Sequence, residues 1–174
     1  MTVLDVELGR CRLRSFRPGD EAALQRHADN WEIARWLRDS FPHPYSADAA
    51  AHWVAYASGP GQPWVVAIDV DGEVAGCVGL TPGTDVFGRS AEIGYWIGEP
   101  FWGRGLAPLA VQALVDWTWA NTPFERLHAG VFSGNERSGK VLLRCGFHLE
   151  SVRARGVYKA GAVLDEWVYV CLRP

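Results

Sequence analysis

The stretch Glu92–Leu114, "EIGYWIGEPFWGRGLAPLAVQAL", places an expected strand, a glycine-rich turn and an expected helix in direct succession. Gly103 and Gly105 precede the helix, which we place from Pro108 to about Ala120 because apolar side chains recur there at helical spacing. Proline suits the first helical position, where the N–H needs no partner. Glycines beside a helix start let a ligand approach free backbone amides, which favour a phosphate. The unit therefore predicts an anion-binding turn, with a tight turn made only for packing as the alternative.

The segments on both sides of this unit alternate between strand and helix patterns. Working outward, we expect strands at 10–16, 64–70, 73–80, 90–98, 125–132, 149–158 and 162–171, and helices at 20–28, 31–37, 47–57, 108–120 and 135–147. Asp20 and Ser46 are expected N-caps, Asp71-Gly72 an expected hairpin turn, and residues 59–63 an expected helix end. This order predicts one α/β domain over residues 1–174, with helices packed on a single mixed sheet.

Composition indicates a globular protein without a metal or disulfide framework. The 174 residues are 48% hydrophobic and 21% charged, which disfavours disorder. The four cysteines form no CxxC pair, so we expect no zinc site and a cytoplasmic location. The N-terminus has no apolar signal segment and no apolar run reaches membrane-spanning length, so no membrane partner is expected.

The charge is distributed unevenly along the chain. The net charge is −3, which gives no reason to expect a nucleic-acid partner, but residues 126–159 hold seven Lys or Arg against two Glu. A basic half suits an anionic ligand. Solvated faces of helices and strands would explain the same charges equally well.

Two nucleotide-binding patterns are possible readings of the glycines. Residues 103–108 read GxGxxP, but the second βαβ half that a dinucleotide fold requires does not follow. Gly134–Val141, "GNERSGKV", has the spacing of a phosphate-binding P-loop. Val141 stands where such a loop needs Ser or Thr to hold Mg²⁺. A nucleotide hydrolase or kinase is therefore disfavoured.

The sequence resembles the GNAT superfamily of acetyl-CoA-dependent N-acetyltransferases. Trp102–Ala107, "WGRGLA", is similar to that family's pyrophosphate motif, and Asn135–Phe147, "NERSGKVLLRCGF", is similar to its second cofactor motif. One helix and one strand separate the two motifs, as in the family. The resemblance extends over nearly the whole chain, and is greatest to the branch that includes ribosomal-protein N-terminal (alanine/serine) acetyltransferases.

This resemblance implies a mostly antiparallel mixed sheet in which two parallel strands, Glu92–Ile97 and Arg126–Phe132, splay apart to admit acetyl-CoA. It also implies a set of cofactor-binding residues, in which the turn binds pyrophosphate through its backbone, the strand faces the pantetheine and thioester, and Asn135 bonds the pantetheine. The set is Trp96, Ile97, Gly103, Arg104, Gly105, Leu106, Ala107 and Asn135. Pro108 lacks an N–H, so one pyrophosphate contact is missing here. Asn135 is also an expected N-cap, and the two roles are compatible.

Two residues are candidates for the chemistry of acetyl transfer. Glu92 is the candidate general base, directly or through water, and lies on the same strand face as Gly94 and Trp96. Ser138 is the candidate to hydrogen-bond the departing thiolate, because Leu142 stands where many relatives have a tyrosine. A solvated carboxylate and an ordinary helix serine are the plain alternatives. No metal is expected.

The acceptor remains open between three alternatives. A peptide or protein N-terminus is the first choice, because the N-terminal helices carry Asp20, Glu21, Asp29, Glu32, Asp39 and Asp48 and would attract a basic acceptor. The loop at 81–90 is expected to line an open groove. His43 and Tyr45 are expected either to border the acceptor or to belong to a loop packed by its own prolines and aromatic residues. A small amine such as a polyamine, amino acid or antibiotic is the second choice. A non-catalytic CoA-binding sensor is the third, and the chain is expected to be a monomer or homodimer.

Overall fold

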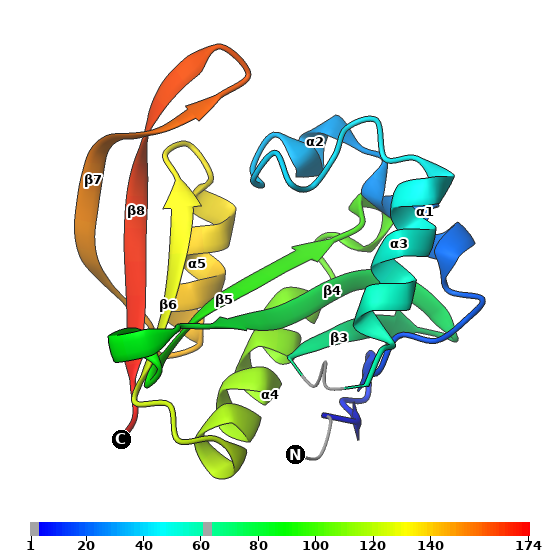
Figure 1. The fold of residues 1–174 in the computed structure, drawn as a ribbon, viewed down its shortest axis with the longest axis horizontal. Coiled ribbons are helices and arrows are strands. Elements are labelled where there is room, and N and C mark those ends of the chain that lie inside the picture. Colours follow the sequence, from blue (N-terminus) through cyan, green and yellow to red (C-terminus); the bar gives the residue numbers. More distant parts are fainter. Residues whose placement is uncertain (1–3, 61–63) are drawn as a thin grey trace.

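The computed structural model describes residues 4–60 and 64–174, and its strands form one sheet in the order β1-β2-β3-β4-β5-β6-β8-β7 (Figure 1). The strands are β1 (Val6–Glu7), β2 (Arg12–Arg14), β3 (Val65–Val70), β4 (Glu73–Pro82), β5 (Ser90–Ile97), β6 (Arg126–Phe132), β7 (His148–Lys159) and β8 (Ala162–Leu172). The helices are α1 (Glu21–Ala28), α2 (Trp31–Ala34), α3 (Ala47–Ala57), α4 (Leu106–Asn121) and α5 (Glu136–Arg144), with 3-10 turns η1 (Asp85–Phe87) and η2 (Glu99–Phe101). Parts of two expectations, the signal-free N-terminus and the loop after the third helix, fall at residues 1–3 and 61–63, outside the described ranges.

The sheet is mixed, as predicted, and its one parallel pair among the described strands is β5 with β6. These two strands pair only from Ser90–Glu92 to Arg126–His128. Beyond that register they diverge, so the predicted splay is confirmed (Figure 1). A sheet built mostly of antiparallel pairs also excludes the parallel dinucleotide-binding fold.

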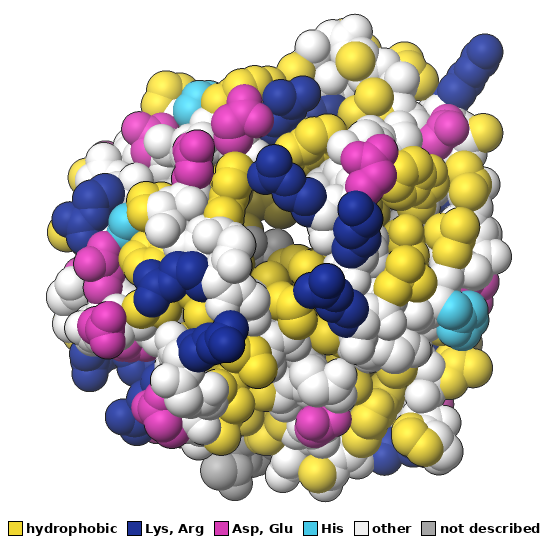
Figure 2. Space-filling view, turned by 180° about the vertical axis from the view of Figure 1, so that it is seen from behind, with side chains coloured by type: hydrophobic (Ala, Val, Ile, Leu, Met, Phe, Trp, Pro, Cys, Tyr) yellow, Lys and Arg dark blue, Asp and Glu magenta, His cyan; other side chains and the backbone are white. Residues whose placement is uncertain are grey.

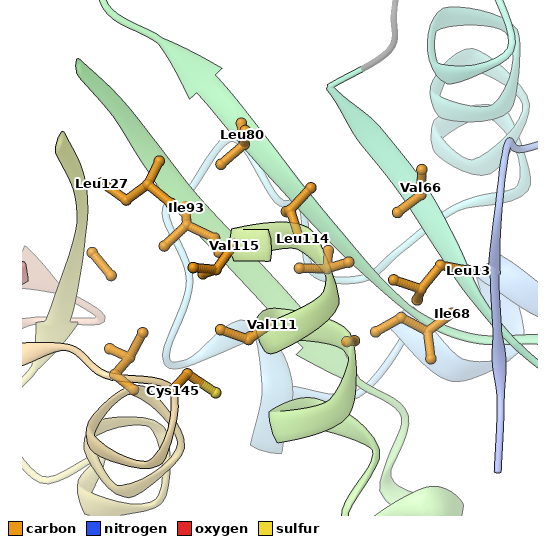
Figure 3. Packing of buried hydrophobic residues seen from close by; sticks show 14 of the residues in the cluster. Leu13, Val66, Ile68, Leu80, Ile93, Val111, Leu114, Val115, Leu127 and Cys145 are labelled. Carbon is orange, nitrogen blue, oxygen red and sulfur yellow. The ribbon is translucent and has the colours of Figure 1, made fainter. Parts of the chain in front are cut away.

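An apolar core lies between the sheet and the pair α4 and α5. Val111, Leu114 and Val115 of α4 project toward strand residues such as Ile93 and Leu127, all of them 3% exposed or less (Figure 3). Their i, i+3, i+4 spacing puts them on one helix face, which explains why this helix was predicted from the sequence. The packing holds the N-terminal end of α4 against the place where β5 and β6 part.

The opposite face of the sheet is covered by α1 and α3 and contains a buried ion cluster. Arg14 of β2 donates to Asp69 at 2.6 Å and to Asp20 at 2.8 Å, and each of the three side chains is less than 10% exposed. Asp20 does precede α1, but its carboxylate binds Arg14 and the Arg17 amide rather than capping the helix. Ser46 caps α3 as predicted, accepting from the Ala49 amide at 3.1 Å.

The boundaries differ from the prediction at three places. The fourth helix begins at Leu106, so Pro108 is its third residue and not its first. Proline still fits there, because no N–H of the first turn has a partner within the helix. The short strand β1 was not predicted, since Val6–Glu7 has no periodicity to detect. The second helix ends at Ala34, three residues earlier than expected.

Candidate active site

The divergence of β5 and β6 opens a cavity of about 1030 Å³ that passes between the two faces of the sheet. Its wall includes β5, the turn before α4, the start of α5, β6 and the segment after α2. Figure 2 shows a hollow with Lys and Arg side chains around its rim, and Arg137 and Arg144 are among the lining residues. The basic rim matches the charge asymmetry of the sequence and favours an anionic ligand.

The turn before α4 presents backbone amides to this cavity. Gly103 has a φ of +74° and Gly105 a φ of +72°, a left-handed conformation that strongly favours glycine. Gly105 is the N-cap of α4, so the amides of Leu106 and Ala107 lie in the first turn, where they have no partner within the helix. Gly103, Gly105, Leu106 and Ala107 all line the cavity. The turn is therefore a cradle for an anion at a helix N-terminus.

Arg104 points elsewhere. Its guanidinium stacks on the Phe101 ring at 5.5 Å, and its carbonyl accepts from Arg10 Nη1 at 3.2 Å. Arg104 is not among the residues of the described cavity wall, although Phe101, on which its guanidinium stacks, is one of them. Arg10, which the sequence did not single out, adds a cation next to the turn.

The start of α5 forms the second wall of the cavity. Asn135 lines it and caps the helix, accepting from the Ser138 amide at 3.4 Å. Gly139 and Lys140 lie inside the helix and not in a loop. A P-loop needs the residues between its two glycines to wrap a phosphate, so the nucleotide-binding reading of Gly134–Lys140 is wrong.

Ser138 is bound to a tyrosine that the sequence analysis did not select. Tyr95 of β5 places its hydroxyl 2.8 Å from Ser138 Oγ and 3.0 Å from the Ser138 carbonyl oxygen. Burial raises the pKa of Tyr95, so the phenol stays protonated and donates to Ser138. Leu142 is fully buried in the core. Strand alternation could have found Tyr95, since it is the polar member of the otherwise apolar face formed with Ile93 and Ile97.

Trp96 and Ile97 both line the cavity, on opposite faces of β5. The Ile97 carbonyl accepts from the Trp102 indole at 2.7 Å, so that backbone group is already engaged. Trp96 packs edge-on against the Phe41 ring at 5.7 Å. The indole thus forms a wall on the face covered by α1 and α3.

Glu92 lies on that same face, as predicted. Its carboxylate lines the cavity and forms an ion pair of 2.6 Å with Arg38, whose side chain is 66% exposed. The next residue, Asp39, pairs with Lys159 at 2.7 Å. Trp36 lies against Gly134, where an added Cβ would be 3.3 Å from its ring. The segment Trp36–Asp39 therefore bridges this face of the cavity, the one on which Glu92 and Trp96 lie, through contacts with three distant parts of the chain.

Three expectations about the surroundings of the acceptor are corrected. The loop at 81–90 sits beside the start of β5, where β5 and β6 are still paired, and in the described structure only Thr81 of this loop reaches the cavity wall. His43 turns to Asp29 at 3.5 Å and is not part of the described wall, whereas Tyr45 lines it and is buried, which raises its pKa to about 12. Asp20 cannot attract an acceptor, because Arg14 neutralises it in the interior.

Two further searches were confined to residues 4–60 and 64–174. There, no three His, Cys, Asp or Glu side chains are grouped so that they could hold a metal ion. Within the same ranges, no helix has the length and apolar character needed to cross a membrane.

The family model described as an acetyltransferase (GNAT) domain matches residues 10–148 of the chain. An uncharacterised N-acetyltransferase of Bacillus subtilis (strain 168) is 35% identical over 86 residues, which are 49% of this chain and 49% of the relative. The ribosomal-protein-serine acetyltransferase of Escherichia coli (strain K12) is 32% identical over 81 residues, covering 47% of this chain and 45% of the relative. These matches thus span about half the length of the curated relatives.

Solved structures resemble the whole fold. A ribosomal L7/L12 α-N-protein acetyltransferase, solved in complex with coenzyme A, superimposes with a TM-score of 0.79 over 94% of each chain. At 22% sequence identity this likeness concerns the fold alone. The arrangement of β5, β6, α4 and α5 around the cavity is thus one that other proteins share.

Proposed function

Because the chain belongs to the GNAT acetyltransferase family, we propose that it transfers the acetyl group of acetyl-CoA to a primary amine. The observation that carries the proposal is the split between β5 and β6, which opens onto the glycine turn and the free amides at the start of α4. A thioester with a long phosphate-bearing arm needs both features. The arm requires a slot through the sheet, and its phosphates require N–H donors at the end of that slot.

The residues around the cavity fit coenzyme A from end to end. Leu106 and Ala107 offer amides for the pyrophosphate, and Gly103 and Gly105 leave room for close approach. Asn135, at the start of α5, bonds the pantetheine arm. Backbone groups of β5 around Trp96 and Ile97 face the thioester end, although the engaged Ile97 carbonyl leaves that residue its N–H alone.

The reaction needs a proton removed from the amine and a stable leaving thiolate. Glu92 accepts the amine proton, directly or through water, once the acceptor ammonium has taken the place of Arg38 as its partner. Ser138 donates its hydroxyl proton in a hydrogen bond to the departing thiolate. Tyr95 hydrogen-bonds Ser138 Oγ and so holds the serine hydroxyl in position beside the sulfur. Tyr95 thereby provides a phenol near the leaving thiolate, whereas α5 has the buried Leu142 at the position where many relatives have a tyrosine.

A basic peptide N-terminus is the acceptor that the charges favour. Glu32 and Glu92 are acidic residues of the cavity wall, Asp29 follows the end of α1, and Asp48 lies in the first turn of α3 on the same face. Names among the relatives point the same way, since one is a ribosomal-protein-serine acetyltransferase. A small amine is the second candidate, because the bridging segment Trp36–Asp39 narrows this face. The four free cysteines agree with action in a reducing cytoplasm.

An acceptor panel tests the proposal. The protein is given acetyl-CoA with short basic peptides that carry a free N-terminus, with acidic peptides, and with spermidine and an aminoglycoside, and free thiol and product mass are followed. Basic peptides should be acetylated fastest at low salt, and their advantage should shrink as salt screens the exposed charges. A small amine acetylated at least about tenfold faster than every peptide would contradict the peptide assignment. Acetyl-CoA binding without transfer to any acceptor would contradict the enzyme assignment and favour a CoA sensor.

A further inference from the structure

The gap between β5 and β6 is bordered by two glycines on the acceptor face. Glu92 and His128 are paired in register, so the next residues on this face are Gly94 and Gly130. Both glycines are exposed and both line the cavity. An amine that approaches a thioester in the split therefore meets a place without side chains, where it can come close to the backbone.

A second carboxylate lies on this face, beside Gly130. Glu166 of β8 pairs in register with Phe132 of β6, and its carboxylate lies directly against Gly130, where a Cβ would overlap with it. The side chain lines the cavity and is only 15% exposed. A carboxylate that is largely buried beside an open cavity is costly unless a cation balances it.

The cation that balances Glu166 is a side chain at the protein surface. Arg153 of β7 donates from Nη1 to Glu166 at 2.9 Å, and its side chain is 65% exposed. Glu92 has the same arrangement with Arg38, whose side chain is 66% exposed. Each carboxylate of the gap is thus held by one arginine whose side chain is largely exposed. The ammonium group of a bound ligand can take the place of either arginine and still balance the charge of the carboxylate.

We infer that Glu166 is an acceptor-binding residue, which together with Glu92 holds the ammonium group of a cationic amine over the Gly94–Gly130 gap. This inference rests on the proposed function for the position of the thioester, but it concerns binding alone. Glu166 approaches the ammonium from β8 while Glu92 approaches from β5, so the nitrogen is placed between the two strands. Neutral amides and alcohols can donate hydrogen bonds to the two carboxylates but cannot balance their charge, so the pair selects for charged amines.

The test measures binding and needs no turnover. The peptide Ala-Arg-Arg-Ala-amide and its N-acetylated form are titrated by calorimetry into the protein saturated with CoA. The unmodified protein should bind the free peptide at least about tenfold more tightly than the acetylated one, because only the free peptide has an N-terminal ammonium. Glu166→Gln and Gly130→Ala should each remove most of that difference. Arg153→Gln should increase it, because Glu166 then has no competing partner.

Glu150→Gln is the matched control, since Glu150 pairs with Arg126 on the neighbouring part of the sheet and lies outside the cavity wall. It should leave the difference unchanged. An unchanged difference in Glu166→Gln would overturn the inference, and so would equal binding of the two peptides to the unmodified protein. A structural ion pair would make Glu166→Gln and Arg153→Gln act in the same direction, which also overturns it. Glu166-dependent binding without acetylation would instead uphold the inference and contradict the proposed function.

Discussion

The two sides of the cavity are built in different ways. On the side that we propose for the cofactor, called the cofactor side, the polar groups belong to the backbone of one continuous segment, Trp102–Ala107, and to the first turn of α5. On the acceptor side they are side chains from separate elements, and the Arg38–Glu92 pair alone joins residues 54 positions apart. A backbone cradle depends on local conformation, whereas the acceptor side depends on tertiary ion pairs. Substitutions on the cofactor side should therefore change the affinity for CoA, whereas substitutions in the ion pairs that support the acceptor side should change the free energy of unfolding.

The residues that pack beneath the two sides differ too. The largest predicted effect of a substitution concerns the stability of the part beneath the acceptor side. The core under α4 is apolar, whereas the frame of the acceptor side contains the buried cluster of Arg14, Asp20 and Asp69. Arg14→Met should lower the free energy of unfolding by about 3–5 kcal/mol, because two carboxylates remain buried without their cation. Urea unfolding followed by circular dichroism measures this change.

Arg12→Met is the matched control on the same strand. Arg12 pairs with Asp5 at the surface, where both side chains are 52% exposed, so the loss should be about 0–1 kcal/mol. Equal losses in the two variants would mean that the buried cluster is not what holds the acceptor side.

The cofactor side should respond to a backbone change. Gly105→Val adds a branched Cβ at a φ of +72°, in the turn that presents the amides, and should weaken CoA binding by on the order of 10²-fold. Gly72→Val has the same kind of strain at a φ of +88°, with no heavy atom within 4 Å of the added Cβ, and Gly72 is not part of the described cavity wall. The control should keep its CoA affinity in calorimetry. A folded Gly105→Val protein with unchanged affinity would show that the turn is only structural.

Ser138 lies between the two sides of the cavity, and its substitution tests whether it takes part in the reaction or in CoA binding. Ser138→Ala should lower kcat by on the order of 10²-fold or less while the CoA affinity changes little, because the thiolate forms only as the bond breaks. Tyr95→Phe should lower kcat by a smaller factor, since it removes only the group that orients the serine. Steady-state kinetics with a peptide acceptor measures both. Equal kcat in Ser138→Ala and the unmodified protein would remove the serine from the mechanism.

The smallest predicted effect is the rate at which one buried cysteine on each side of the cavity is alkylated. Burial raises the pKa of Cys77 on the acceptor side to about 12 and that of Cys145, which donates to the Pro108 carbonyl, to about 11. The thiolate is the reactive form, so alkylation of both should be slow at pH 8 and should rise about tenfold per pH unit up to pH 10. Mass spectrometry of iodoacetamide-treated protein measures the two rates. Fast labelling of Cys77 at pH 8 would mean that the acceptor face opens more widely than described.

The same contrast separates what the sequence could predict from what it could not. The glycine turn and the Asn135 cap follow from contiguous patterns, the splayed strands follow from the family resemblance, and nine of the ten residues selected for the site line one cavity. Arg38 and Glu166 escaped because nothing near them in the sequence indicates a partner on a distant strand. Asp20 was misjudged for the same reason, since its partner Arg14 becomes buried only when β2 joins the sheet. Features that depend on neighbouring residues could be predicted from the sequence, whereas ion pairs between residues that are distant in the sequence could not.

The most direct measurement of the central claim is a pair of calorimetric titrations of the unmodified protein, one with acetyl-CoA and one with ATP and Mg²⁺. A cavity that runs through the split sheet to the amides of α4 should bind acetyl-CoA with micromolar affinity and give no binding heat with ATP. Binding of ATP that requires Mg²⁺, without any binding of acetyl-CoA, would contradict the account.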